Sequence, residues 1–302
     1  MAQKISSNWR GQLTGSSILA ISGAGAVNFL QGQLSNDVAK LDDDHCQWSG
    51  YHQPDGRVLA VPLVVLQEGI INLVLPTDTV NDISDRLSRY VLRAKVEFAV
   101  SECGLLGLAG PTLADQLADF TLPQPGRVTR TPGGLTLAAY GWQRVLAWGP
   151  ASSIDWQKIT NALSEEPESM WLLEDIREGI PRVVTAGQGL YTAQMLNLDL
   201  IDAISFNKGC YAGQEIIART QNLGKIKRRL CRLGSETEVT GSDVCLANGD
   251  KVGEILNRQK SSTDSQLACE CLAVIRLNQR QADLYIDGAP LIHLDLPYAV
   301  GD

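Results

Sequence analysis

The sequence predicts an α+β fold that ends in a small all-β barrel or sandwich, and two observations lead to this prediction. In the first two-thirds of the 302 residues, helical and strand-like patterns mix without the strict alternation typical of a parallel sheet. From Arg229 to Asp302, five or six short strand-like runs are separated by Gly, Asn, Asp and Ser clusters, and helical spacing is absent. The boundary is expected near residues 220–228.

The elements of the first part are predicted from the spacing of apolar residues. Strand-like segments occupy residues 18–22, 58–75, 95–100, 104–109 and 134–148. Helical spacing occupies residues 26–34, 80–91, 111–120, 153–163 and 170–178. The 58–75 segment is interpreted as two strands around a turn at Gln67–Gly69, and the 134–148 segment as a hairpin that turns near Tyr140–Gln143. An acidic linker, 164–169, is expected between the last two helices.

Three helix boundaries are predicted from capping chemistry. Thr77 or Thr79 is expected to cap the helix over 80–91. Pro111 suits the first position of the next helix, where a missing N–H costs nothing. The helix that begins near Met170 is expected to end before Gly179.

The bulk composition favours a soluble, cytoplasmic protein. The net charge of −8 argues against nucleic-acid binding through the overall field of the protein. The N-terminal segment has no apolar core typical of a signal peptide, and the apolar stretch Val58–Pro76 is interrupted by polar residues and Pro62. No membrane association is therefore expected.

The cysteines are odd in number and irregularly spaced, and they form no C-x-x-C pair. This pattern argues against a disulfide framework and a structural zinc site, so no metal site is predicted. All cysteines except Cys210 are expected to be small buried hydrophobes. The seven are Cys46, Cys103, Cys210, Cys231, Cys245, Cys269 and Cys271.

Cys210 stands apart because Gly209 and Gly213 frame it. Residues 214–220 are compatible with a short helix, whose N-terminal dipole favours a thiolate just before it. Lys208 acts in the same direction. The pattern indicates a reactive, partly exposed thiol, although a buried cysteine is about as consistent with the residues alone.

Between Phe206 and Arg232 the chain carries a net charge of +6. The seven basic residues are Lys208, Arg219, Lys225, Lys227, Arg228, Arg229 and Arg232, and Glu215 is the single acid. Such a segment can form a focused positive site for an anionic ligand tail, a phosphate or an RNA backbone, or it can be a solvated linker.

Trp171 opens the helix that ends before Gly179. An indole at this place can stack on a flat ligand ring, although a single Trp is more often part of the core.

The motif Lys-Gly-Cys-Tyr-Ala-Gly-Gln-Glu at 208–215 resembles the signature of the YgfZ family. The flanking blocks 194–199, 204–206, 219–220 and 227–228 are similar to that family in the same order. Upstream, Phe29–Val38 is similar to its early helix and Tyr51–Arg57 to its next strand-turn block. The resemblance extends in blocks from about residue 18 to 230.

The resemblance implies a fold like that of the aminomethyltransferase of glycine cleavage. Residues 1–225 would form two interwoven α+β domains that enclose a folate pocket, and residues 226–302 a C-terminal β-barrel. It also implies tetrahydrofolate as cofactor and a role in assembling or repairing iron–sulfur enzymes, including tRNA-modifying ones. Cys210 and Lys208 would be the catalytic residues. The folate-binding residues would be Trp171, Gln194, Asn197, Tyr211, Gln214, Glu215 and Arg228.

The chain departs from the related patterns at three places. Residues 57–62 contain no carboxylate where aminomethyltransferases carry an aspartate pair. Arg177-Glu178-Gly179 stands where the family often has Glu-Ala-Gly, so the acid has moved by one position, about 100° around a helix. A second folate-contacting tryptophan expected near residue 16 is absent.

Three alternative functions are compatible with parts of the sequence. The first is a one-carbon transferase that uses tetrahydrofolate, which the missing carboxylate disfavours. The second is a tRNA-binding module that acts through the basic segment at 219–232. The third and weakest is a thiol protease, for which His45, His52 and His293 are the available bases.

Overall fold

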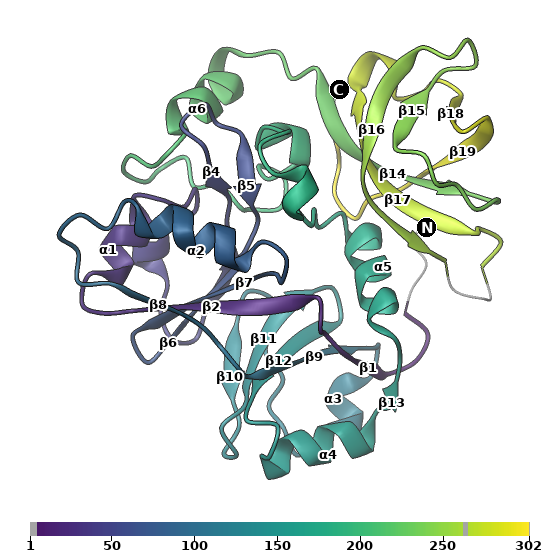
Figure 1. The fold of residues 1–302 in the computed structure, drawn as a ribbon. Helices are drawn as coiled ribbons and strands as arrows, with labels where there is room; N and C mark the ends of the chain where they lie inside the picture. Colours follow the sequence, from purple (N-terminus) through teal and green to yellow (C-terminus); the bar gives the residue numbers. More distant parts are fainter. Residues whose placement is uncertain (1–4, 262–264, 302) are drawn as a thin grey trace.

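In the computed structural model, which describes residues 5–261 and 265–301, two open sheets, a short hairpin and a closed barrel carry the strands (Figure 1). The two open sheets lie side by side, and the barrel packs at the other side of helix α5 (Figure 1). Within the described part of the chain, no helix is long and apolar enough to cross a membrane.

The five-stranded sheet has the order β3-β6-β7-β2-β8 and is antiparallel throughout. Its strands are β2 (Ser16–Ser22), β3 (Cys46–Trp48), β6 (Leu63–Gln67), β7 (Ile70–Pro76) and β8 (Glu97–Val100). Helices α1 (Ala26–Gln31) and α2 (Val80–Ser88) pack on it. Val80, Ile83 and Leu87 of α2 are buried, as their helical spacing predicts.

The six-stranded sheet has the order β10-β11-β12-β9-β1-β13. Its strands are β1 (Trp9–Gln12), β9 (Gly104–Ala109), β10 (Val128–Arg130), β11 (Thr136–Gly141), β12 (Arg144–Gly149) and β13 (Ser164–Glu165). Helices α3 (Leu113–Gln116) and α4 (Ile154–Ala162) share a hydrophobic core cluster with this sheet. Strand β1 lies in this sheet although β2, the next strand in the chain, lies in the other. The two halves are therefore interwoven, which confirms the predicted α+β class.

The barrel closes in the order β14-β17-β16-β15-β18-β19. Its strands are β14 (Arg228–Ser235), β15 (Asp243–Cys245), β16 (Lys251–Lys260), β17 (Cys269–Arg276), β18 (Leu284–Ile286) and β19 (Ala289–Leu294), with the 3₁₀ helix η4 (Leu277–Gln279) after β17. All six strands overlap the strand-like runs of the sequence, and closure shows a barrel rather than a sandwich. The division into regions 1–225 and 226–302 stays a prediction.

The connections between these units hold the signature motif. The hairpin consists of β4 (Tyr51–His52) and β5 (Val58–Ala60), and helix α6 (Gln214–Leu223) lies beside it (Figure 1). Helix α5 (Glu168–Glu178) packs against β1, β16 and β17 and thus joins the first part to the barrel. The remaining 3₁₀ helices are η1 (Val38–Lys40), η2 (Thr185–Gly187) and η3 (Gln194–Leu196).

Several local expectations are corrected. The 58–75 segment forms three strands, because Pro62 interrupts it and β5 pairs with β4; the turn at Gln67–Gly69 is as predicted. Helix α3 begins at Leu113, after Pro111, and has only four residues. Thr79 occupies the N-cap position of α2, but its hydroxyl donates to the Pro76 carbonyl instead of capping.

The expected acidic linker at 164–169 is also structured. Ser164 and Glu165 form β13, which pairs in parallel with β1, and α5 already begins at Glu168. Strand β1 offers an open edge to this segment, and no local pattern signals that pairing.

Candidate functional site

The signature loop is held against the segment that follows α1. The backbone N–H of Ala212 donates to the Gly32 carbonyl at 3.3 Å, and that of Ser205 donates to the Ser35 carbonyl at 3.0 Å. Gly213 adopts φ 80° at the start of α6, and a Cβ there would lie 2.7 Å from the Gln53 carbonyl oxygen. Glycine is therefore required at this close approach.

Cys210 is exposed on this loop, four residues before α6 begins. The exposure agrees with the prediction of an accessible thiol. Cys103 is exposed too and Cys245 is half-buried, so the expectation that all other cysteines are buried is wrong for these two. Burial raises the pKa of Cys46 and of Cys271 to about 12, which keeps both thiols protonated.

Lys208 fastens the loop through its ammonium group. Its Nζ donates to the carbonyl oxygens of Leu34 and Asn36, each at 2.7 Å, and lies 5.2 Å from the ring centroid of Tyr211. Burial lowers the pKa of Lys208 to about 8. The side chain is thus a positioning group for the loop that carries Cys210.

Three of the predicted folate-binding residues are buried beside this loop. Gln194 donates from Nε2 to the Ile217 carbonyl at 2.9 Å, which joins η3 to α6. Asn197, in the left-handed region at φ 57°, donates to the Leu230 carbonyl on β14 at 2.9 Å. Tyr211 packs in the same core cluster. These contacts assemble the surroundings of the loop.

The other predicted residues near the loop lie at the surface. Gln214 and Glu215 form the first turn of α6, with Glu215 exposed. Arg228 begins β14 and is exposed. Trp171 is not part of this group.

Trp171 is 1% exposed and lies in a core cluster to which both open sheets contribute. Its ring centroid is 4.7 Å from that of Tyr140, and the guanidinium carbon of Arg144 lies 4.5 Å from the Trp171 ring centroid. Trp48 packs against both this cluster and the cluster that holds Tyr211.

The space beside Trp171 is small. A cavity of about 20 Å³ is lined by Trp48, Tyr140, Trp171 and Arg182, among others. This is scarcely more than the room that one water molecule needs, about 10–15 Å³. The fused rings of a pterin therefore require the cleft to open.

The chemistry of this cleft nevertheless suits a pterin. Aromatic rings line it, and such rings can stack on a flat ligand ring. Asp175 and Arg144 do not line the cleft; they form a buried ion pair at 2.8 Å, with Arg144 against the Trp171 ring. Asp175 Oδ2 and Arg144 NH2 have no hydrogen-bond partner among the described residues, and burial raises the pKa of Asp175.

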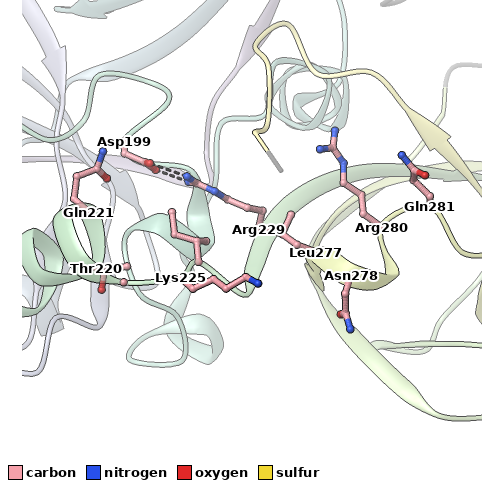
Figure 2. A pocket seen from close by; sticks show the side chains of 11 residues that line it. Asp199, Thr220, Gln221, Lys225, Arg229, Leu277, Asn278, Arg280 and Gln281 are labelled. Atoms are coloured by element: carbon pink, nitrogen blue, oxygen red, sulfur yellow. Dashed lines mark hydrogen bonds and ion pairs between the residues drawn. The ribbon is translucent and has the colours of Figure 1, made fainter.

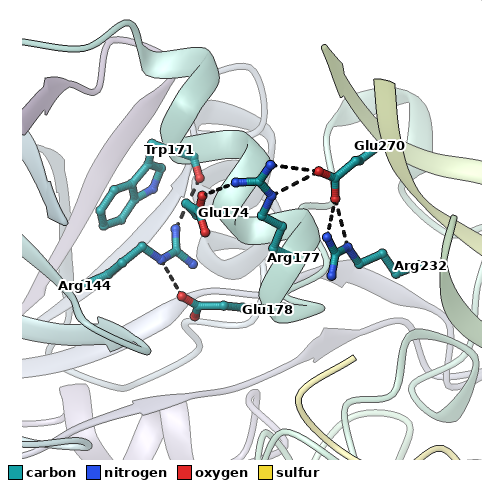
Figure 3. A network of polar contacts seen from close by, with 7 residues as sticks. All are labelled: Arg144, Trp171, Glu174, Arg177, Glu178, Arg232 and Glu270. Carbon is teal, nitrogen blue, oxygen red and sulfur yellow. Dashed lines mark hydrogen bonds and ion pairs between the residues drawn. The ribbon is translucent and has the colours of Figure 1, made fainter. Parts of the chain in front are cut away.

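Glu178, the acid of α5 that stands one position away from its place in the family pattern, belongs to a buried ionic network (Figure 3). Glu178 accepts from Arg144 Nε at 2.8 Å and from the Trp142 backbone N–H at 3.0 Å. Arg177 points the other way, to Glu174 and to Glu270 on barrel strand β17, each at 2.8 Å. Burial by itself would lower the pKa of Arg177, but the two carboxylates outweigh it and raise that pKa.

Sequence reasoning missed Arg144 and Glu270. Each is the one buried charged residue of its strand, in Arg144–Gly149 and Cys269–Arg276 respectively. A charged side chain inside a run of apolar residues is the signal that would have identified them, because such groups are seldom buried without a partner.

The basic segment is less positive at the surface than its composition predicts. Arg229 is buried against Asp199, with NH1 2.6 Å from Oδ1, and Arg232 is buried against Glu270. Lys208 is half-buried. The exposed cations are Arg219, Lys225, Lys227 and Arg228.

Relatives of the chain are found among known proteins, although no family model matches it. A protein of Vibrio vulnificus strain YJ016, named tRNA-modifying protein YgfZ, is 30% identical over 241 residues, which cover 78% of this chain and 73% of the relative. The protein of the same name from Colwellia psychrerythraea is 31% identical over 225 residues, covering 73% and 69%. The one from Shigella sonnei is 28% identical over 303 residues, covering 94% and 91%.

Among solved structures, the glycine cleavage system aminomethyltransferase T of Bartonella henselae matches with a TM-score of 0.77 at 17% identity. The match covers 97% of this chain and 87% of that one, and it shows that the fold is shared. With its signature loop, its interwoven halves and its closed barrel, the chain belongs to the YgfZ family.

Proposed function

We propose that this chain binds tetrahydrofolate and supports the assembly or repair of iron–sulfur enzymes through the Cys210 thiol, in the cytoplasm. The observation that carries the proposal is the exposed Cys210 on a loop that Lys208 fastens by two hydrogen bonds. An accessible thiol held on a rigid loop can attack an electrophile or ligate iron transiently. In this proposal Cys210 is the catalytic residue, and Lys208 is the residue that positions its loop.

The relatives' name links them to tRNA modification. We extend that link to this chain, so that its clients include tRNA-modifying enzymes and its partners include tRNA itself. The aminomethyltransferase-like fold supports a folate ligand, which would supply a one-carbon carrier or acceptor. Trp171 and Tyr140, which line the cleft, would hold its pterin ring once the cleft opens.

The thiol is tested by replacing it in cells that lack the native protein. Cys210→Ser is expected to abolish support of an iron–sulfur tRNA-modifying enzyme, while Cys103→Ser, which changes the other exposed thiol, retains it. The soluble yield and the far-UV circular dichroism of both variants show whether the fold persists. Normal support by Cys210→Ser would refute the role of the thiol.

The folate site is tested by titrating the purified protein with tetrahydrofolate and following tryptophan fluorescence. Binding weakened by Trp171→Phe but not by Trp142→Phe, at an indole that is 72% exposed, is the expected result. If the wild-type protein does not bind, the cleft beside Trp171 stays closed and folate has no role there.

A further inference from the structure

A large hollow lies where the first part of the chain joins the barrel (Figure 2). Its volume is about 590 Å³, and it lies between the C-terminal end of α6 and the η4 turn of the barrel. Residues 224–227 connect α6 to β14, and Gly224, Lys225 and Ile226 of this connection line the hollow together with Arg229. It is distinct from the Cys210 loop and from the cleft beside Trp171, because neither of these residues lines it.

The wall of the hollow is anchored on both sides. The backbone N–H of Leu277 donates to the Lys227 carbonyl at 2.9 Å, which attaches the connecting segment to η4. Arg229 donates to both oxygens of Asp199, at 2.6 and 2.9 Å, and to the Gln194 carbonyl at 2.9 Å. Asp199 thereby neutralises Arg229, the most buried cation of the site, and leaves the charge of the hollow to the other basic residues.

Those residues carry uncompensated positive charge. Lys225 and Arg280 line the hollow, and neither forms an ion pair within the described residues; Arg280 donates to the Val300 carbonyl at 2.7 Å. Lys227, Arg228 and Arg276 are exposed nearby and are also without an ion pair to any described residue. A group of five cations on a chain of net charge −8 forms a localised positive field.

The pairing of β14 with β17 adds a second observation. Arg228 lies directly opposite Arg276 in the antiparallel register, and both side chains are exposed. Like charges at directly opposed positions destabilise a strand pair. An anion bound between the two guanidinium groups would remove this repulsion.

The other groups in the lining define the chemistry of the ligand. Gln221, Asn278 and Gln281 contribute three amides, which suit phosphate oxygens and ribose hydroxyls, whereas the Thr220 hydroxyl donates to the Ile216 carbonyl at 2.8 Å. None of the described lining residues is aromatic, so the site offers no stacking platform for a base. Beyond the hollow, exposed cations continue at Lys227 and at the facing strand ends Arg228 and Arg276, so that more than one phosphate can be bound.

We propose that the hollow at Lys225 and Arg280, with the adjoining Lys227, Arg228 and Arg276, binds the phosphate backbone of RNA. The site reads charge and sugar rather than base sequence. It gives a location to the tRNA contact in the proposed function and rests on that part of it alone, since it requires neither folate nor Cys210.

The experiment measures the affinity of the purified protein for tRNA between 50 and 200 mM salt. The variant Lys225→Gln/Lys227→Gln/Arg276→Gln is compared with Arg89→Gln/Arg93→Gln/Lys95→Gln, which removes the same charge from exposed residues just after α2. Three lost phosphate contacts should reduce the slope of log K against log salt by about 2–3. The wild type and the control should therefore lose roughly 16- to 64-fold more affinity across this range than the variant.

A second pair of variants locates the contact in the hollow. Asn278→Asp introduces a negative charge there without changing the size of the side chain, and Asn81→Asp does the same on the exposed surface of α2. Weaker tRNA binding by Asn278→Asp alone supports the site. Equal binding by both triple variants, or by both aspartate variants, overturns it, as does a wild-type protein that does not bind tRNA at low salt. The tetrahydrofolate titration and the Cys210 assay remain independent of these results.

Discussion

The carboxylate of Glu270 holds together the ionic network between α5 and the barrel, and its neutralisation should be costly. Glu270 is fully buried on β17 and accepts from Arg177 Nε at 3.1 Å and NH2 at 2.8 Å, and from Arg232 Nε at 2.9 Å. Glu270→Gln keeps the shape of the side chain but removes the charge. Arg177 would retain Glu174 as its carboxylate partner, whereas Arg232 would retain the Asp295 carbonyl.

The size of the effect follows from the burial of both partners. Removing one member of a buried ion pair costs about 3–5 kcal/mol, because an uncompensated charge stays in a poorly solvated site. With an unfolding entropy of about 2.1 cal/mol/K per residue, each kcal/mol lowers the melting temperature of this 302-residue chain by about 1.6 °C. We therefore expect Glu270→Gln to melt roughly 5–8 °C below the wild type.

The assay is urea-induced unfolding followed by circular dichroism, together with a thermal melt. The control is Glu238→Gln, the same substitution in the barrel at an exposed pair, where Glu238 lies 3.0 Å from Lys260. Exposed pairs contribute about 0.2–1 kcal/mol, so the control should be almost unchanged. If Glu270→Gln costs no more than Glu238→Gln, the ionic network does not stabilise the docking of the barrel and the reasoning is wrong.

Three further predictions concern other parts of the molecule. Burial lowers the pKa of His52 to about 3, so between pH 6.5 and 3 the unfolded chain binds a proton that the folded chain excludes. The free energy of unfolding should therefore fall as the pH drops through this window, by about 2–3 kcal/mol at pH 4.5. His52→Gln should abolish that part of the loss. If the variant shows the same dependence of stability on pH as the wild type, His52 is not the group responsible. Under native conditions, a disulfide reagent should modify Cys103 and Cys210 quickly and Cys46, Cys231, Cys269 and Cys271 only on unfolding; mass spectrometry of the labelled peptides checks this, and rapid labelling of Cys46 would disprove the packing. A Cβ at Gly107 would overlap the ring of Trp171, so Gly107→Ala should cost about 1–3 kcal/mol in urea unfolding. Gly32→Ala, whose Cβ meets only an ordinary contact at 3.6 Å, should be tolerated. Equal stabilities of the two variants would show that the Trp171 ring can move aside.

Much of the fold could be predicted because its determinants are local. The alternation of apolar residues places six barrel strands, and the spacing in Val80, Ile83 and Leu87 places α2. The glycines around Cys210 predict an open loop before α6, and that loop is observed with the thiol exposed. Each of these features depends on neighbours within a few positions of the chain.

The predictions that failed depend on partners that are distant in the sequence. Residues 164–169 were expected to be a linker, but Ser164 and Glu165 pair with β1 across more than 150 positions. The net charge of +6 in the basic segment is partly compensated in the folded protein, because Arg229 pairs with Asp199 and Arg232 pairs with Glu270. Neither partner can be identified from residue spacing.

The sequence by itself therefore determined the positions of the helices, most of the strands, the family signature and the accessible thiol at Cys210. Only the tertiary structure decided that Arg144 covers the ring of Trp171, that Arg177 turns to the barrel and that Lys225 and Arg280 line one hollow. The physical reason is that burial and electrostatic pairing depend on which elements meet in space. Arg177 and Glu270 are 93 positions apart, and only the packing of α5 against β17 brings their charges together.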